Sequence, residues 1–148
     1  EFVNPNDLDH LFEKISGFKT NFFTLNDGQG TYSLVIFDNR KVRVNGEIKN
    51  LQVLHDKDIM LFPLMKTMKS LGYSVSDNHD QSILIKNKQN QFIIYENQSR
   101  FLHNGQSFGV LENPFRNKNG MIYINEKGLY TLFKVKVFLL EKEISLSD

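Results

Sequence analysis

The alternation of apolar and polar positions along the chain forms a pattern that occurs twice. Each copy contains a short strand leading into Asn-Gly, a loop, an apolar strand, a short helix and a closing strand. Asn45-Gly46 and Asn104-Gly105 predict type I′ turns, which favour this dipeptide because both central residues need a positive φ. Equivalent positions keep a nearly constant spacing, since Phe62 and Tyr123 lie 61 positions apart. Such a period is typical of a duplicated supersecondary unit. The pattern therefore predicts two units, at residues 40–87 and 98–147.

The first copy has the clearer helix signal. Pro63 suits the first helical position, and Leu64, Met68 and Leu71 follow it at the spacing of one helix face. Gly72 can adopt the left-handed conformation that often ends a helix. We therefore expect a short helix that buries these three apolar side chains and turns its lysines toward solvent.

The second copy predicts a weaker helix. Asn125 can cap it, with Leu129 and Leu132 facing inward. Gly128 inside this helix costs about 1 kcal/mol relative to alanine.

Three further elements lie outside the two copies. Residues 6–16 have the periodicity of an amphipathic helix, and residues 21–25 and 32–37 alternate as the two strands of a hairpin. Residues 91–95 alternate as a strand between the copies.

Together these elements predict an α+β fold. Two repeated strand-loop-strand-helix-strand units pack as one domain of residues 1–148, with an N-terminal helix and hairpin in residues 1–39. A chain of this length can bury roughly 70% of its unfolded surface, which is enough for a core without disulfides.

The chain resembles the copper amine oxidase N-terminal-like family, also called the stalk domain, over about residues 40 to 147. The resemblance is carried by the strand into Asn-Gly, an apolar strand ending in a Pro-Leu step, a helix closing on Leu-Gly and a final strand, which here are Val44-Asn45-Gly46-Glu47, Leu61-Phe62-Pro63-Leu64-Met65, Leu71-Gly72-Tyr73-Ser74-Val75 and Ser82-Ile83-Leu84-Ile85. The chain departs from the family at Met65, where Arg is common, at Ser76, where Trp is common, and at Phe133, which replaces the glycine. The resemblance implies a non-catalytic module of a secreted or surface-attached bacterial protein, without the copper and quinone of the amine oxidases.

Composition excludes several classes of partner. The net charge is +1, so nothing electrostatic points to nucleic acid or an anionic membrane. The absence of cysteine excludes disulfides and thiolate metal sites. No apolar run reaches the roughly 18 residues of a membrane span. We expect no nucleic acid partner and no membrane span.

Residues that suggest chemistry have structural interpretations. His55 and Asp56 could act together in acid-base catalysis, yet a solvated loop between strands is the favoured interpretation. Residues 77–80 alternate oxygen donors but lack the spacing of an EF-hand. The four histidines also lack metal-ligand spacing. The sequence therefore predicts no catalytic residue, no metal and no cofactor.

The expected function is that of a spacer or protein-interaction module of an exported bacterial protein, outside the cell or at its surface. A glycan- or peptidoglycan-binding accessory domain is the alternative, and a small hydrolase without a recognisable motif is a third. Unpaired strands invite pairing by another chain. We expect a protein partner, or a second copy, at the sheet edge formed by residues 32–37 or 91–95, with Tyr32, Phe92 and Tyr95 as contacts. A cell-wall glycan is the other candidate ligand.

Overall fold

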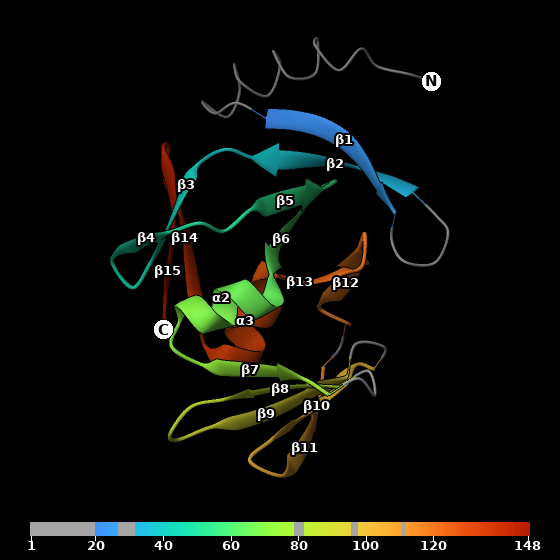
Figure 1. Cartoon of the computed structure of the whole chain (residues 1–148), viewed down its shortest axis with the longest axis vertical. Helices are drawn as coiled ribbons and strands as arrows, with labels where there is room; N and C mark the ends of the chain where they lie inside the picture. Colours follow the sequence, from blue (N-terminus) through green and yellow to red (C-terminus); the bar gives the residue numbers. More distant parts are fainter. Residues whose placement is uncertain (1–19, 27–31, 79–81, 96–97, 111) are drawn as a thin grey trace.

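Most strands of the structure are arranged in antiparallel hairpins (Figure 1). The structure is a computed structural model that describes residues 20–26, 32–78, 82–95, 98–110 and 112–148, and side chains are described from Val35 onward. This part of the chain contains fifteen strands and two short helices. The helices are α2, Leu64–Ser70, and α3, Glu126–Phe133.

The strands form three sheets. The six-stranded sheet has the order β1 (Thr20–Asn26), β2 (Tyr32–Asp38), β5 (Val53–Asp56), β6 (Ile59–Pro63), β13 (Met121–Asn125), β12 (Phe115–Lys118). The five-stranded sheet has the order β11 (Gln106–Gly109), β10 (Arg100–His103), β9 (Gln91–Tyr95), β8 (Ser82–Lys86), β7 (Ser74–Asp77). The four-stranded sheet has the order β14 (Lys136–Leu139), β15 (Glu143–Ser147), β3 (Lys41–Val44), β4 (Glu47–Lys49). Figure 1 shows the two helices between the six-stranded and five-stranded sheets, with the four-stranded sheet at their side.

The predicted α+β fold is wrong, because the described residues form a mostly β structure with only two short helices. The predicted repeated strand-loop-strand-helix-strand units are not the building blocks of the fold either. Hairpin β7–β8 shares a sheet with β10–β11 through β9, and hairpin β14–β15 shares one with β3–β4 through the parallel pair β15 and β3. The error arose because polar segments such as Ser74–Asp77 carry no apolar alternation and yet pair as strands.

A local two-fold relation connects the two helical regions. Strands β6 and β13 pair antiparallel, with Phe62 opposite Ile124 and Pro63 opposite Tyr123. Phe62 and Tyr123 are 61 positions apart, as are Pro63 and Ile124. A two-fold rotation that brings Phe62 to the place of Tyr123 therefore brings Ile124 to the place of Pro63, and so exchanges the two opposed pairs. Contacts follow the same relation, because α2 contacts β7 and β13 while α3 contacts β14 and β6.

Both Asn-Gly turns have the predicted conformation. The φ angles are 47° and 89° at Asn45 and Gly46, and 51° and 83° at Asn104 and Gly105. Two successive positive φ values are what a type I′ hairpin turn requires. The turns join β3 to β4 and β10 to β11. Strands β1 and β2 also pair as the predicted hairpin, whereas the helix predicted at residues 6–16 lies outside the described residues.

Helix α2 matches its prediction closely. Leu64, Met68 and Leu71 are buried, and Gly72 has a φ of 96° just after the helix. Pro63 is the residue before the helix rather than its first residue, with a ψ of 115°. The predicted start was therefore wrong by one position.

Helix α3 is capped by Asn125, whose Oδ1 accepts a hydrogen bond of 2.7 Å from the Gly128 N–H, as predicted. A Cβ at Gly128 would lie 2.4 Å from Pro114 Cβ, so close packing requires the glycine. Lys134 ends the helix with a φ of 59°, so it adopts the left-handed conformation that Gly72 adopts after α2. The structural equivalent of Gly72 is therefore Lys134, which lies 62 positions further along the chain, and not Phe133, as the sequence pattern predicted.

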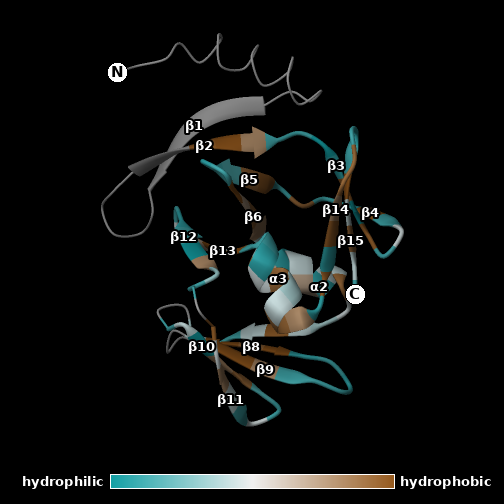
Figure 2. Cartoon of the chain, turned by 180° about the vertical axis from the view of Figure 1, so that it is seen from behind, coloured by the Kyte–Doolittle hydropathy of each residue, from teal (hydrophilic) through white to brown (hydrophobic). Residues whose placement is uncertain are grey.

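The core lies around the two helices. One cluster joins buried residues from all three sheets, including Val44, Phe62, Phe92 and Leu146. Figure 2 shows hydrophobic residues along β6, β8 and β9. Neither described helix is long and apolar enough to cross a membrane.

Candidate functional site

The strands predicted as open edges are both interior. Strand β9 lies between β8 and β10, and β2 lies between β1 and β5. Strand β9 pairs with β8 and β10 and therefore cannot accept another chain in the way we expected. Strand β2 pairs with β1 along its length but with β5 only from Ile36 to Asp38. The prediction failed because it treated both strands as additions outside the repeated pattern, whereas each lies between two other strands.

The predicted contact residues do not form one surface. Phe92 is 3% exposed and packs its ring against Tyr73 and Phe133 in the core. Tyr95 is half-buried at the end of β9. The side chain of Tyr32 lies outside the described side chains.

Two edge strands occupy equivalent places under the local two-fold. Strand β14 is the edge of the four-stranded sheet and β7 the edge of the five-stranded sheet, and their residues are 62 positions apart. Both have the same burial pattern, with only the second residue half-buried. Their sequences differ: β7 reads Ser-Val-Ser-Asp and β14 reads Lys-Val-Phe-Leu.

Strand β14 therefore exposes apolar side chains at positions where β7 is polar. Phe138 and Leu139 are 51% and 50% exposed, and Leu140 just after the strand is 50% exposed. Polar and charged residues are a common protection of edge strands against pairing. Three of the four residues of β7 are polar, whereas in β14 only Lys136 is. The sequence signal is the run of three apolar residues Phe138, Leu139 and Leu140 that follows the alternation of Lys and Val.

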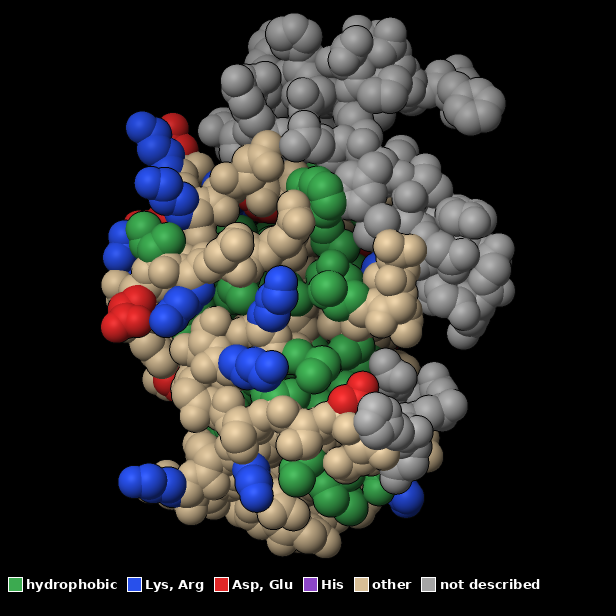
Figure 3. Space-filling view, viewed as in Figure 1, with side chains coloured by type: hydrophobic (Ala, Val, Ile, Leu, Met, Phe, Trp, Pro, Cys, Tyr) green, Lys and Arg blue, Asp and Glu red, His purple; other side chains and the backbone are tan. Residues whose placement is uncertain are grey.

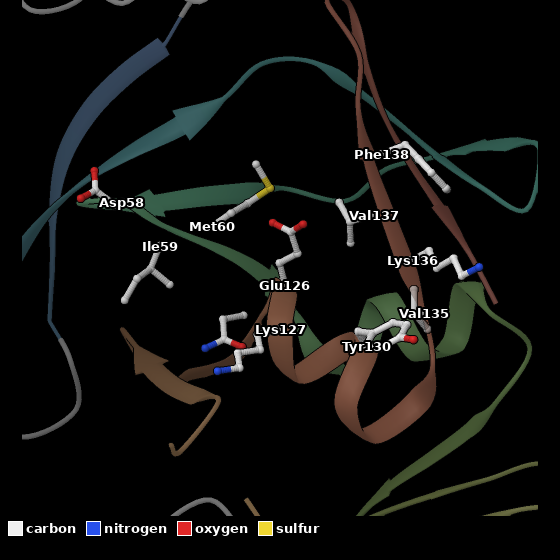
Figure 4. A pocket seen from close by; sticks show the side chains of 11 residues that line it. Asp58, Ile59, Met60, Glu126, Lys127, Tyr130, Val135, Lys136, Val137 and Phe138 are labelled. Carbon is white, nitrogen blue, oxygen red and sulfur yellow. The ribbon is translucent and has the colours of Figure 1, made fainter. Parts of the chain in front are cut away.

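A groove runs beside β14. It has a volume of about 610 Å³ and is formed by the end of the β5–β6 hairpin, the start of α3 and β14. Ile59 and Tyr130 add exposed apolar surface to it, at 37% and 52% exposure. Figure 4 shows side chains from these three elements around the groove, with Met60, Glu126 and Val137 near one another. We call β14 and this groove together the β14 groove.

Charged residues also line the β14 groove. Asp58, Glu126, Lys127 and Lys136 contribute two charges of each sign. Beside it, Lys134 Nζ lies 5.5 Å from the centre of the Tyr130 ring. The groove combines an open strand, an apolar wall and flanking charges, which is the composition of a site for an extended peptide.

Elsewhere, Asp38 forms a buried charge cluster with Arg40 and His55. Asp38 Oδ2 lies 2.6 Å from Arg40 Nη2 and 2.8 Å from His55 Nε2, and the Asp38 side chain is fully buried. Burial disfavours the charged carboxylate, but the hydrogen bonds from His55 and Arg40 outweigh it and hold the pKa of Asp38 well below its usual range. This cluster joins the end of β2 to β5.

The interpretation of His55 and Asp56 as a solvated loop is wrong, because both belong to β5. Asp56 pairs with Lys118 of β12 at 2.6 Å, and the Lys118 side chain is 7% exposed. His55 and Asp56 thus have different partners and do not pair with each other as the catalytic interpretation required. Their side-chain contacts link β5 to β2 and to β12.

Comparison of the chain with protein-family models, curated proteins and solved structures returns no match.

Proposed function

We propose that the chain is a non-catalytic protein-interaction module that binds an extended segment of a partner protein along β14. The observation that carries the proposal is the contrast between the two equivalent edges. Among the described residues, no strand pairs with the outer edge of β7 or of β14, and β14 exposes Phe138 and Leu139 where β7 has Ser76 and Asp77.

The partner segment would add a strand next to β14. Main-chain hydrogen bonds supply affinity in this mode, while alternate side chains of the segment enter pockets beside the edge. The β14 groove offers such a pocket, with Ile59 and Tyr130 as apolar contacts. A segment with apolar residues at alternate positions therefore suits the site.

The setting we propose, an exported bacterial surface or secreted protein, rests on the resemblance to the stalk-domain family. The non-catalytic role is supported by the use of Asp38 and His55 in a buried bridge between strands. The binding role rests on β14 alone and can be tested separately.

Selection of random peptides displayed on phage against the immobilised protein would test the binding site. The double variant Phe138→Ser with Leu139→Asp gives β14 the polar residues of β7. We expect this variant to lose the selected peptides. Ile48→Ser is the matched control, because Ile48 is 52% exposed on β4, at the opposite edge of the same sheet.

Methionine methyl NMR locates the bound peptide. The methyl of Met60, which lines the β14 groove, should shift, whereas that of the fully buried Met68 should not. Peptides that bind the double variant as tightly as the parent would refute the site. A dimer formed through β14 without peptide would replace the partner segment with a second copy of the chain.

A further inference from the structure

A second groove lies beside α2, at the place that the local two-fold relates to the β14 groove. It has a volume of about 340 Å³, within the range of small-molecule sites. Its wall is apolar, and is formed by Pro63, Met65, Ile83, Met121 and Ile122. We call it the α2 groove.

The two grooves are built from equivalent elements. Each is lined by one helix, by the hairpin that follows this helix, and by the end of the β5–β6 or β12–β13 hairpin on the other side of the two-fold. Lys66 in the α2 groove corresponds to Lys127 in the β14 groove, each 61 positions from the other. Lys69 corresponds to Tyr130 in the same way. The α2 groove thus has a second cation where the β14 groove has an aromatic ring.

Lys66 and Lys69 give the α2 groove a positive side. They lie three positions apart on α2, which puts them on neighbouring turns of one face. Both are exposed, and no described residue forms an ion pair with either. Figure 3 shows Lys or Arg side chains over α2, next to hydrophobic side chains. Asp77, which also lines the groove, has contacts of its own.

We propose that the α2 groove binds a small amphipathic carboxylate. The apolar body of the ligand lies against Met65, Met121 and Ile122, and its carboxylate lies between the ammonium groups of Lys66 and Lys69. An apolar wall with a few placed charges is the usual composition of a small-molecule site. The adjacent edge strand β7 is polar, which makes an extended apolar peptide a poor occupant of this groove. The proposal is independent of peptide binding at β14.

The four methionines of the chain provide a direct test. Met65 and Met121 line the α2 groove, Met60 lines the β14 groove, and Met68 is fully buried. In protein labelled at its methionine methyl groups, sub-micellar decanoate should shift the signals of Met65 and Met121 and leave those of Met60 and Met68 in place. Decanol, which has the same chain without the charge, should bind more weakly.

Charge-removing variants test the role of the lysines. An exposed ion pair changes affinity by up to about fivefold, so Lys66→Gln and Lys69→Gln should each weaken decanoate binding by about that factor and the double variant by more. Added salt should reduce the difference. Lys88→Gln, in the turn between β8 and β9, is the control and should bind as the parent does.

Three results would overturn the proposal. The first is an absence of saturable decanoate binding. The second is equal affinity for decanol, or for decyltrimethylammonium, because the lysines would then play no part. The third is an equal shift of Met60, which would show unspecific adsorption to apolar surface. Loss of peptide binding in the β14 variants would leave all of these readouts unchanged, so the two proposals fail separately.

Discussion

Arg40 Nη1 donates a hydrogen bond of 3.0 Å to the carbonyl oxygen of Leu140, 100 positions further along the chain. The same guanidinium holds the buried carboxylate of Asp38. One side chain thus connects the buried charge cluster of the six-stranded sheet to the end of the β14 edge. Arg40 thus links the buried charge cluster to the segment that carries the exposed side chains of Phe138, Leu139 and Leu140.

Asp38→Asn should destabilise the protein strongly at neutral pH. Removing one member of a buried ion pair leaves the other charges uncompensated and typically costs roughly 3–5 kcal/mol. Because the pKa of Asp38 is lowered in the folded state, its stabilisation is present above the unfolded value of about 3.9 and is lost as pH falls through the folded pKa. Urea unfolding of parent and variant at several pH values should show a difference that shrinks only in acid.

Glu143→Gln is the control for this prediction. Its bridge to Arg43 is 2.8 Å long, close to the 2.6 Å between Asp38 and Arg40, but the Glu143 and Arg43 side chains are 30% and 38% exposed. Exposed pairs contribute about 1 kcal/mol or less. Similar losses in the two variants at pH 7 would contradict a special role for the Asp38 cluster.

Gly128→Ala should destabilise the protein although alanine favours helices. The new Cβ would lie 2.4 Å from Pro114 Cβ and 2.9 Å from Ile124 Cγ1. Overpacking costs about 1–3 kcal/mol, while the gain in helix propensity is about 1 kcal/mol. Thr131→Ala, at an exposed position of the same helix, should be neutral or slightly stabilising. Thermal unfolding of both variants decides, and a Gly128→Ala protein with a raised Tm would show that the packing against Pro114 is wrong.

Lys134→Gly should be more stable than Lys134→Ala by about 1 kcal/mol. Both variants lose the contact with Tyr130, so their difference isolates the backbone. The φ of 59° at this position favours glycine, since a Cβ in the left-handed region costs about 1–2 kcal/mol. An ordinary helical position would favour alanine instead. Chemical denaturation of the pair therefore checks whether α3 ends at this residue.

Thr67→Val should leave stability unchanged or raise it by about 1 kcal/mol. The Thr67 hydroxyl is buried in α2, and among the described residues it has no hydrogen-bond partner. Valine has the same shape as threonine and lacks the hydroxyl, so it removes the cost of burying an unpaired polar group. Thr67→Ala should be less stable than Thr67→Val because it also leaves a cavity. A clear loss in the valine variant would indicate that the hydroxyl is paired in solution.

Local structure was more accessible to sequence reasoning than the assembly of the sheets. The turn at Asn45-Gly46, the buried face of α2 and the cap at Asn125 depend on neighbouring residues, and their predictions are confirmed. Sheet order depends on pairings between distant strands, such as β15 with β3, that no local pattern encodes. Polar strands such as β7 were missed because their neighbours, rather than their own side chains, make them strands.

The candidate site was missed for a related reason. Phe138 was visible as an aromatic residue, but its exposure follows from the place of β14 at the edge of a sheet. Phe92 was chosen for its alternating strand, which the structure places in the interior of the five-stranded sheet. His55 contacts Asp38 rather than Asp56. This contact depends on which strands are neighbours in the sheet, so the sequence alone did not predict it.

The parallel pair β15 and β3 has a consequence for how the chain is made. Val44 pairs with Leu146, so the four-stranded sheet joins segments about a hundred positions apart. Contacts at such sequence separation slow folding, because a long loop must close before they form. During synthesis the β3–β4 hairpin is made about a hundred residues before β15, and it lacks this neighbour until β15 has followed. For that interval the edge of β3 is unpaired, and an unpaired strand edge makes an incompletely folded chain prone to aggregation.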